Sequence, residues 1–208
     1  MKQINIETIR NTTIELIKKR GYNSVTINDI CTECNITKPT FYKYAGSKDE
    51  LILDLYDITI KELVSDPYYF IETDSSLEQL YYIFSKLIND TQTFGNELFS
   101  HMIISNLQNN RHSFDMRESL TRMGELIIKK AQEKGEINNI NEPKRLYNAL
   151  AHLFTGHELK WCISNGASDD FSDFFEEVND ILDVREDLRH LYLKYLQNEN
   201  LEGTGGQS

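Results

Sequence analysis

Residues 26–51, TINDICTECNITKPTFYKYAGSKDEL, contain two short helical patterns separated by a turn, and they are the most informative segment of the chain. Thr26 followed by Asp29 predicts a helix N-terminus, where the two side chains satisfy backbone N–H groups of the first turn. Asn35 stands where the chain must reverse, and among non-glycine residues Asn tolerates the left-handed conformation best. The pattern therefore predicts a short helix that ends in a tight turn.

A second, very short helix is predicted to begin at Thr37, whose hydroxyl can cap it. Pro39 falls in the first turn, where a missing N–H costs nothing because that donor has no partner within the helix. Gly46 ends the segment, and Ser47 with Glu50 forms a Ser-x-x-Glu capping box for the next helix. A helix, a tight turn and a short helix form the arrangement that places the second helix in the DNA major groove.

The segments on either side extend this unit. Upstream, apolar residues share one face of residues 6–17, and the basic run 18–20 precedes Gly21, which accepts a positive φ; a first helix is expected there. Downstream, one long helix is predicted to run through Leu51, Leu55, Ile58 and Leu63 until Asp66-Pro67 closes it. Because that helix leaves the small unit, we place the domain boundary near residue 48.

The remainder of the chain is also predicted to be helical, so the fold class is all-α. Apolar residues recur at spacings of three and four, and the chain has three prolines. A Ser76/Gln79 cap, a break at Gly95 and a helix start at Pro143 bring the expected total to nine or ten helices. We expect a helix-turn-helix DNA-binding domain at 1–48, a helical-bundle domain at 49–200 and a disordered Gly-rich tail at 201–208.

Charge and composition narrow the possible functions. The net charge is −11, yet the first fifty residues carry eight Lys/Arg and six Asp/Glu, which gives +2 there and −13 for the rest. Any DNA contact must therefore come from a small, locally basic face. No apolar run approaches a membrane span and the start lacks a secretory pattern, so a cytoplasmic protein is expected.

Residues 26–51 closely resemble the signature of the tetracycline-repressor family. The resemblance rests on the capped second helix, the Ile36-Thr37 turn, the Phe41-Tyr42-x-Tyr44 core and the Ser47-Lys48-x-Glu50-Leu51 opening, and it covers about the first 55 residues. Ala45 departs from the pattern, because the family usually has an aromatic residue there; Tyr22 or Tyr44 is expected to fill the space.

The resemblance implies a transcription regulator that is a homodimer on a palindromic operator. Residues 146–161 and 171–195 would form the dimer interface. An unidentified small-molecule effector bound in the helical C-terminal domain would shift the dimer away from the DNA-binding geometry, so that repression ends when the effector binds.

The DNA-contacting residues are expected on the short helix and at helix starts. Thr37, Lys38 and Thr40 are the candidates for base contacts, since they lie in the first turn. Tyr42 and Lys48 match positions that hold phosphates in the family, and Thr26 would act similarly. Lys43 is a weaker candidate, and Phe41 should point into the core.

Aromatic and histidine side chains of the C-terminal domain allow two interpretations, a packed core or a ligand pocket. The pocket candidates are Phe84, Phe99, His101, Phe154, His157 and Trp161. Cys31 and Cys34 are interpreted as packing residues, with a redox pair as the alternative. The histidines lack metal-ligand spacing, although His101 and His157 could meet, and neither a metal nor a cofactor is expected.

Two further classes of function remain beside the regulator. A co-regulator of the same fold would dock a partner protein and leave DNA unbound, an alternative that the nearly neutral first fifty residues and Ala45 motivate. An enzyme is not expected, because the sequence shows no nucleophile-base pair, phosphate loop or metal spacing.

Overall fold

The computed structural model describes residues 4–53, 55–65, 73–108, 117–167 and 171–196, and helices are the regular elements throughout these ranges. One isolated antiparallel bridge joins Ile137 to Val184. The all-α prediction is confirmed. The described residues form eleven α-helices and two 3-10 helices, slightly more than the nine or ten expected. The predicted tail at 201–208 lies outside the described residues.

The N-terminal unit consists of α1 (Ile6–Arg20), the 3-10 helix η1 (Tyr22–Ser24), α2 (Ile27–Glu33) and α3 (Lys38–Tyr42). The turn chemistry expected from the sequence is confirmed. Thr26 and Asp29 form a reciprocal capping box at the start of α2. Asn35 has a φ of 50°, and the Thr37 hydroxyl caps α3. Local hydrogen bonds therefore set both the reversal of the chain and the direction of α3.

The interior of the N-terminal unit is small and apolar. Ile9, Ile30 and Phe41 have no exposed surface, and together they bring α1, α2 and α3 against one another. The Arg10 side chain, itself buried, donates from Nε to the carbonyl oxygen of Leu51 at 3.0 Å. That bond fixes α1 against the helix that leads out of the unit.

The long helix expected after residue 47 appears as two helices, α4 (Lys48–Leu53) and α5 (Leu55–Ser65). Residue 54 between them lies outside the described residues, as does the expected terminator Asp66-Pro67. Ser47 accepts a hydrogen bond from the Glu50 N–H at 3.1 Å, as the capping box requires. The Glu50 carboxylate reaches back to the N–H of Gly46 at 2.6 Å, one residue earlier than expected.

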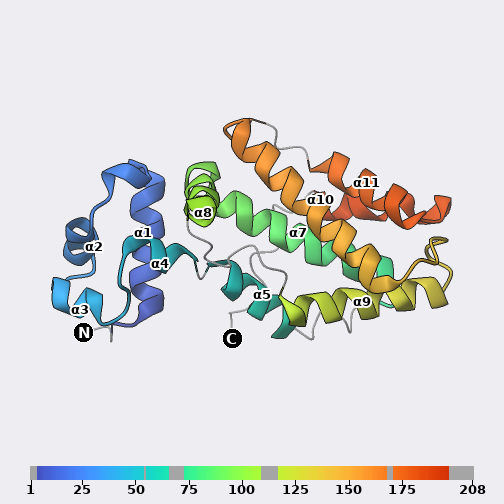
Figure 1. Ribbon diagram of the computed structural model, residues 1–208, viewed down its shortest axis with the longest axis horizontal. Helices are drawn as coiled ribbons and strands as arrows, with labels where there is room; N and C mark the ends of the chain where they lie inside the picture. Colours follow the sequence, from blue (N-terminus) through green and yellow to red (C-terminus); the bar gives the residue numbers. More distant parts are fainter. Residues whose placement is uncertain (1–3, 54, 66–72, 109–116, 168–170, 197–208) are drawn as a thin grey trace, which may run out of the picture.

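A larger helical body follows, composed of α7 (Ser76–Phe94), α8 (Asn96–Gln108), α9 (Glu118–Glu133), α10 (Pro143–Ile163) and α11 (Ser172–Leu182). The chain then forms η2 (Glu186–Tyr192) and α12 (Leu193–Leu196). Figure 1 shows α1 to α3 as one group at the left, with α4 leading from it toward the body at the right. Both α7 and α10 pack on α9, and α10 also packs on α8 and α11.

The boundaries of these helices agree with the sequence at three points and differ at one. Gly21 and Gly95 have φ angles of 81° and 83° and follow α1 and α7 directly, and Pro143 is the first residue of α10. The cap of α7 is Ser75, which accepts from the Glu78 N–H at 3.2 Å, and not the predicted Ser76. Ser76 is instead buried as the first residue of the helix.

Aromatic side chains form the centre of the body. The ring of Phe174 lies 5.0 Å from that of Phe84 and 5.7 Å from that of Phe154, measured between centroids. The ring of Tyr147 on α10 packs directly against Gly124 on α9, where a Cβ would lie only 2.1 Å from the ring. The close approach of α9 and α10 therefore depends on a residue without a side chain.

Buried polar groups join segments far apart in the chain. Glu136, after α9, accepts hydrogen bonds from the N–H groups of Ser76 and Leu77 at 3.2 and 2.8 Å, so a carboxylate lies at the positive end of α7. Glu158 on α10 is buried and accepts from the Thr91 hydroxyl at 2.7 Å. These contacts fix α7 against α9 and α10.

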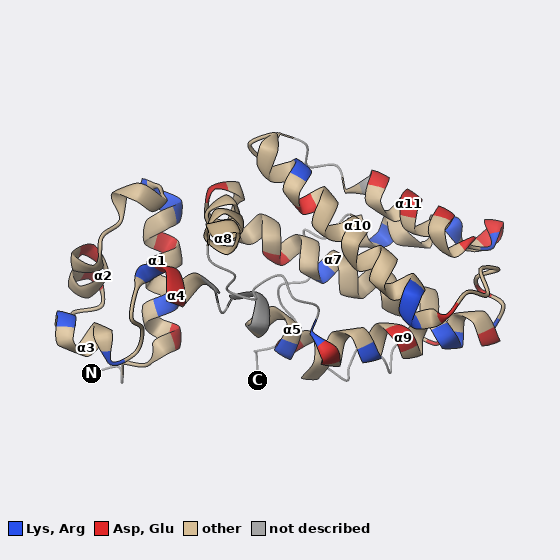
Figure 2. Cartoon of the chain, viewed as in Figure 1, with Lys and Arg blue, Asp and Glu red and all other residues tan. Residues whose placement is uncertain are grey.

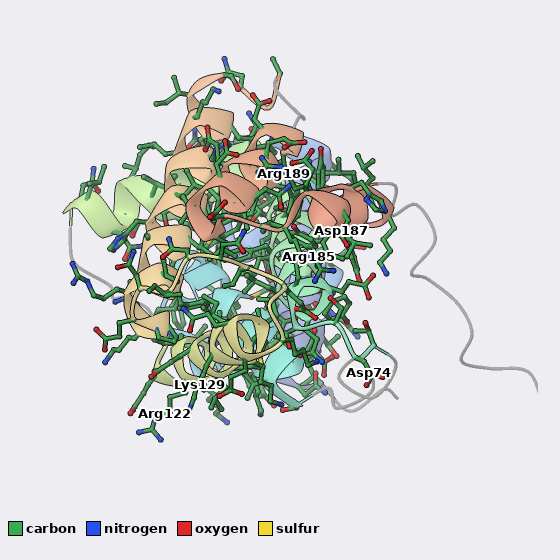
Figure 3. All side chains as sticks on the ribbon, turned by 90° about the vertical axis from the view of Figure 1, so that its right-hand side faces the viewer. Asp74, Arg122, Lys129, Arg185, Asp187 and Arg189 are labelled. Atoms are coloured by element: carbon green, nitrogen blue, oxygen red, sulfur yellow. The ribbon has the colours of Figure 1, made fainter. Side chains whose placement is uncertain are left out.

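The outer end of the body is charged. Figure 3 shows this end, with Arg185, Asp187 and Arg189 on the segment that follows α11. Arg185 pairs with Asp187 at 2.6 Å, and Arg189 with Asp180 at 2.5 Å.

No helix among the described residues is long and apolar enough to span a membrane.

Candidate DNA-binding interface

The start of α3 lies on the surface of the N-terminal unit. Thr37 and Lys38 are exposed, and Thr40 is half-buried. The Thr37 hydroxyl accepts from the Thr40 N–H at 3.3 Å and lies 2.9 Å from the Thr40 hydroxyl. The three candidates for base contacts thus occupy one turn of helix whose geometry is fixed by its own side chains.

The remainder of α3 has one inward and one outward face. Phe41 is fully buried and anchors the helix, as expected, while Tyr42 is 53% exposed. Lys43 is exposed directly after it. Figure 2 shows basic residues at both ends of α3, and in this segment they are Lys38 and Lys43. The outward face therefore combines a phenol hydroxyl, two ammonium groups and hydroxyl-bearing side chains.

Ala45 is buried, and the two tyrosines expected to fill the space around it have different environments. Tyr44 is half-buried and donates from its hydroxyl to the carbonyl oxygen of Ile4 at 3.1 Å. Tyr22 turns away toward α4 and α8. Tyr44 thus connects the end of α3 to the residues before α1.

Thr26 lies at the exposed start of α2, where a phosphate contact was predicted. Its hydroxyl donates to the Asp29 carboxylate at 2.5 Å and accepts from the Asp29 N–H at 3.3 Å. The Thr26 hydroxyl and the Thr26 backbone N–H both donate to the Asp29 carboxylate, and these two hydrogen bonds lower the pKa of Asp29. The Thr26 side chain therefore has a structural role in α2, and its phosphate contact stays a prediction.

Lys48 points inward. Its ammonium group donates to the carbonyl oxygens of Tyr22 and Val25 at 2.6 and 2.9 Å and lies 3.7 Å from the centroid of the Tyr22 ring. Burial lowers the pKa of Lys48, and the nearby Glu97 carboxylate opposes that effect. Because two of its three N–H groups bind carbonyl oxygens, Lys48 connects α4 to η1. Its phosphate contact stays a prediction that depends on the third N–H.

Tyr22 makes contacts between the N-terminal unit and the body that the sequence did not identify. Its backbone N–H donates to the Glu97 carboxylate at 2.8 Å, and its ring stacks on His101 at 3.8 Å between centroids. Its hydroxyl donates to the carboxylate of Asp49. Glu97 and His101 are one turn apart on α8, so Tyr22 joins the N-terminal unit to the body. No local pattern could have revealed contacts between residues more than seventy positions apart.

The six pocket candidates divide between two places: Phe84 packs on Phe154 at 5.7 Å between centroids in the core, whereas His101 lies at the border with the N-terminal unit. Phe84, Phe99, Phe154 and Trp161 are buried in the core of the body. His157 lies against Phe174 and 2.9 Å from the Glu177 carboxylate, whereas His101 stacks on Tyr22. Of the six, His101 alone lines the cavity between η1, α4 and α8 in the described part of the chain. A pocket built from the other five stays a prediction.

The cysteines and acidic residues provide no evidence of a metal site. Cys31 is buried, Cys34 is half-buried and both are free thiols; burial raises the pKa of Cys31, which favours the uncharged, packing form. Among the residues that the structure describes, no group of three His, Cys, Asp or Glu side chains could hold a metal ion.

Residues 9–55 match the family model described as bacterial regulatory proteins, tetR family. Two uncharacterized HTH-type transcriptional regulators of Bacillus subtilis are similar over this region. YuxN is 36% identical over 61 residues, which are 27% of this chain and 21% of YuxN. YerO is 43% identical over 47 residues, which are 23% of this chain and 16% of YerO. The chain therefore matches only about a fifth of the length of these relatives.

Solved structures resemble the chain over nearly its whole length. Thermus thermophilus FadR, a TetR-family transcriptional repressor in complex with lauroyl-CoA, superposes with a TM-score of 0.61 at 22% identity, covering 97% of this chain and 100% of FadR. A TetR transcription regulator from Haloarcula marismortui superposes with a TM-score of 0.63 at 16% identity, covering 86% of this chain and 96% of that protein. At these identities the likeness concerns the fold.

Proposed function

We propose that this chain, a tetR-family regulatory protein by its residues 9–55 and its fold, regulates transcription by binding operator DNA through the outward face of α3. The observation that carries the proposal is the orientation of α3: Phe41 is fully buried, whereas Thr37, Lys38, Tyr42 and Lys43 are exposed. A short exposed helix held by a capped partner helix is the geometry that enters a major groove.

The distribution of charge along the chain supports a DNA contact that is restricted to the N-terminal unit. The first fifty residues carry +2 and the rest of the chain −13. The acidic body repels phosphates, so it orients the N-terminal unit toward DNA. Residues 1–48 accordingly form the DNA-binding domain of the proposal, and residues 49–200 form the regulatory domain. A cytoplasmic location belongs to the same proposal, because the protein must reach the DNA that it binds.

The proposed regulator is a homodimer on a palindromic operator, since two recognition helices about 34–36 Å apart match successive turns of the major groove. An exposed apolar pair on α10 supports an interface there: Leu159 is 45% exposed and Ile163 is 75% exposed, one turn further on. In the other predicted interface segment, 171–195, the aromatic residues are buried within their own chain. The face that α11 leaves exposed is acidic, with Asp173, Glu176, Glu177 and Asp180.

Response to a small molecule is the remaining part of the proposal. FadR, which has the same fold, is a repressor that was solved with lauroyl-CoA. In this chain an effector would act by favouring a relative placement of α3 and the body that does not fit the operator. Tyr22, Glu97 and His101 form the contact through which such a change would pass.

Operator binding is tested with duplexes from upstream of the gene and with sites selected from random duplexes. Lys43→Gln should weaken binding and reduce the dependence of log affinity on log salt by about one unit, because one phosphate contact is lost. Tyr42→Phe should also weaken binding. Lys129→Gln on α9, the same change on an exposed lysine of the body, should leave affinity and salt dependence unaltered.

Equal affinities for the parent, Lys43→Gln and Tyr42→Phe would reject α3 as the contact. If the parent bound no duplex at low salt, where electrostatic attraction is strongest, the co-regulator that docks a partner protein would replace the DNA-binding proposal. Capture of operator by the parent excludes that alternative.

A further inference from the structure

A cavity of about 350 Å3 lies between the N-terminal unit and the body. Tyr22 and Asn23 of η1 form one side, Asp49 and Ile52 of α4 form another, and one face of α8 completes it with His101, Met102, Ile104, Ser105 and Gln108. Ligand sites in proteins commonly measure ~300–1,000 Å3. The volume of this cavity therefore lies within the range of small-molecule sites.

The lining combines an apolar wall with one acidic group. Ile52, Met102 and Ile104 supply the apolar surface, and Asn23, Ser105 and Gln108 supply neutral polar groups. Asp49 is the acid among the described lining residues, and neither Lys nor Arg lines the cavity with it. One carboxylate oxygen of Asp49 accepts from the Tyr22 hydroxyl, which leaves Oδ2 for a donor in the cavity. The lining thus favours a cation over an anion.

The nearest lysine is directed elsewhere. The ammonium group of Lys48 binds the carbonyl oxygens of Tyr22 and Val25, and it lies 3.7 Å from the centroid of the Tyr22 ring. His101 stacks on the same ring at 3.8 Å, so the two groups must occupy opposite faces of it. On the cavity side, the stacked Tyr22 and His101 rings provide an aromatic border beside the Asp49 carboxylate.

We propose that this cavity binds small aromatic organic cations, which place an N–H group on the Asp49 carboxylate. We further propose that their binding lowers the affinity of the protein for operator DNA. The binding step depends on the cavity alone. The regulatory step rests on the proposed DNA-binding function.

The regulatory step follows from the contacts of Tyr22. A ligand N–H on Asp49 Oδ2 withdraws negative charge from the carboxylate and so weakens the hydrogen bond that the Tyr22 hydroxyl donates to Oδ1. A less firmly held Tyr22 loosens its contacts with Glu97 and His101 on α8. Because η1 leads directly into Thr26, the cap of α2, this loosening changes how α2 and α3 sit relative to the body. Linkage then requires that operator-bound protein hold the cation less tightly by the same factor.

Benzamidinium, a planar aromatic cation, is a suitable probe, and benzoate is a control of similar shape and opposite charge. The chain has four methionines, so 13C labelling of their methyl groups gives a simple spectrum. Met102 lines the cavity, whereas Met123 lies on α9 and serves as an internal reference. Benzamidinium should shift the Met102 methyl resonance saturably and leave Met123 in place, and benzoate at equal ionic strength should shift neither.

Two variants identify the site. Asp49→Asn should weaken benzamidinium binding about tenfold, because a charge-assisted hydrogen bond becomes a neutral one. Ser105→Phe should abolish the Met102 response by filling the cavity. Asp74→Asn, which removes an exposed carboxylate at the far end of the body (Figure 3), should bind as the parent does. An unmoved Met102, an equal response to benzoate or parent-like binding by Asp49→Asn would overturn the site.

Operator affinity is measured in the same buffers. Benzamidinium, and not benzoate, should lower it several-fold in the parent and leave it unchanged in Ser105→Phe. A Met102 response without any change in operator affinity would overturn the regulatory step. If the parent bound no operator even without benzamidinium, the DNA-binding function would be rejected, and the Met102 titration would still decide whether the cavity binds cations.

Discussion

The contacts that shape the N-terminal unit and those that stabilise the helical body differ in their separation along the chain. In the N-terminal unit, Thr26, Asn35 and Thr37 act on residues within four positions of themselves. In the body, Phe84 meets Phe174 and Glu136 meets Leu77, pairs that lie more than fifty positions apart. Short-range chemistry therefore shapes the surface proposed to meet DNA, whereas long-range packing decides the stability of the body and carries the proposed response to a small molecule.

The two regions also use charge differently. Lys38 at the start of α3 and Lys43 directly after it have no ion-pair partner among the described residues, so they are available to phosphates, although Arg20 on α1 pairs with Asp29 at 3.4 Å. Charges on the body pair with one another, as Arg189 does with Asp180 at 2.5 Å and with Glu176 at 3.7 Å. If the distinction between the regions is correct, changes in the buried body should alter stability most, and changes at a local cap should have smaller effects confined to the N-terminal unit.

The largest effect is expected at Glu158. Burial raises its pKa to about 8, above the ordinary value near 4.5, so the folded protein holds a proton that the unfolded chain releases. The stabilising contribution of that proton is full below pH 4.5 and is lost as the pH rises through 8. Glu158→Gln cannot ionise, so between pH 5 and pH 8 the parent should lose on the order of 3–4 kcal/mol more of its free energy of unfolding than the variant does.

Denaturant unfolding at pH 5 and pH 8, at one protein concentration, measures that difference. Glu133→Gln, an exposed carboxylate on α9, is the matched control and should follow the parent at both values of pH. Parallel pH profiles for the parent and Glu158→Gln would show that the Glu158 carboxyl is not protonated in the folded protein.

Gly124→Ala should produce the next largest effect. The added Cβ would lie 2.1 Å from the ring of Tyr147, which is buried between α9 and α10, so the free energy of unfolding should fall by about 2–3 kcal/mol. Arg122→Ala on the same helix removes an exposed ion pair with Glu118 and should change stability by less than about 0.5 kcal/mol. Equal stability of the two variants would contradict the close packing of α9 on α10.

The smallest effect is expected at Thr26. Thr26→Ala removes the capping hydroxyl of α2 and should cost about 1 kcal/mol of local stability, whereas Thr26→Ser should retain the cap. Amide hydrogen exchange within α2 should accelerate about fivefold, and exchange at Leu150 in the core of α10 should stay the same. Faster exchange in both α2 and α10 would contradict the view that the Thr26 cap stabilises the N-terminal unit without affecting the body.

Most of the N-terminal unit could be predicted from the sequence. The caps at Thr26 and Thr37, the left-handed Asn35 and the buried Phe41 all appear where the pattern indicated. Errors arose where two neighbouring residues could each satisfy the same helix end. Ser75 caps α7 although Ser76 fits the same motif, because tertiary packing buries Ser76.

The candidate site could be predicted only in part, because some of its side chains are placed by tertiary contacts and not by local pattern. Tyr42 and Lys43 face outward, and their place on α3 follows from helical spacing after Phe41. The family resemblance assigns Lys48 to a phosphate, which stays a prediction, and the structure adds that its ammonium group binds the carbonyl oxygens of Tyr22 and Val25. The sequence gives no measure of which carbonyl groups a folded chain brings within reach of a lysine.

The helical class, the capped short helices of residues 26–51 and the division of charge between the two regions can all be predicted without the structure. Each depends on residues close together in the chain or on composition. Tertiary structure alone decided that Tyr22 stacks on His101, that Glu158 is buried and that Asp49 lines a cavity beside α8. Those outcomes need the packing of helices that are distant in sequence, and apolar spacing shows that a helix face is buried without showing what lies against it.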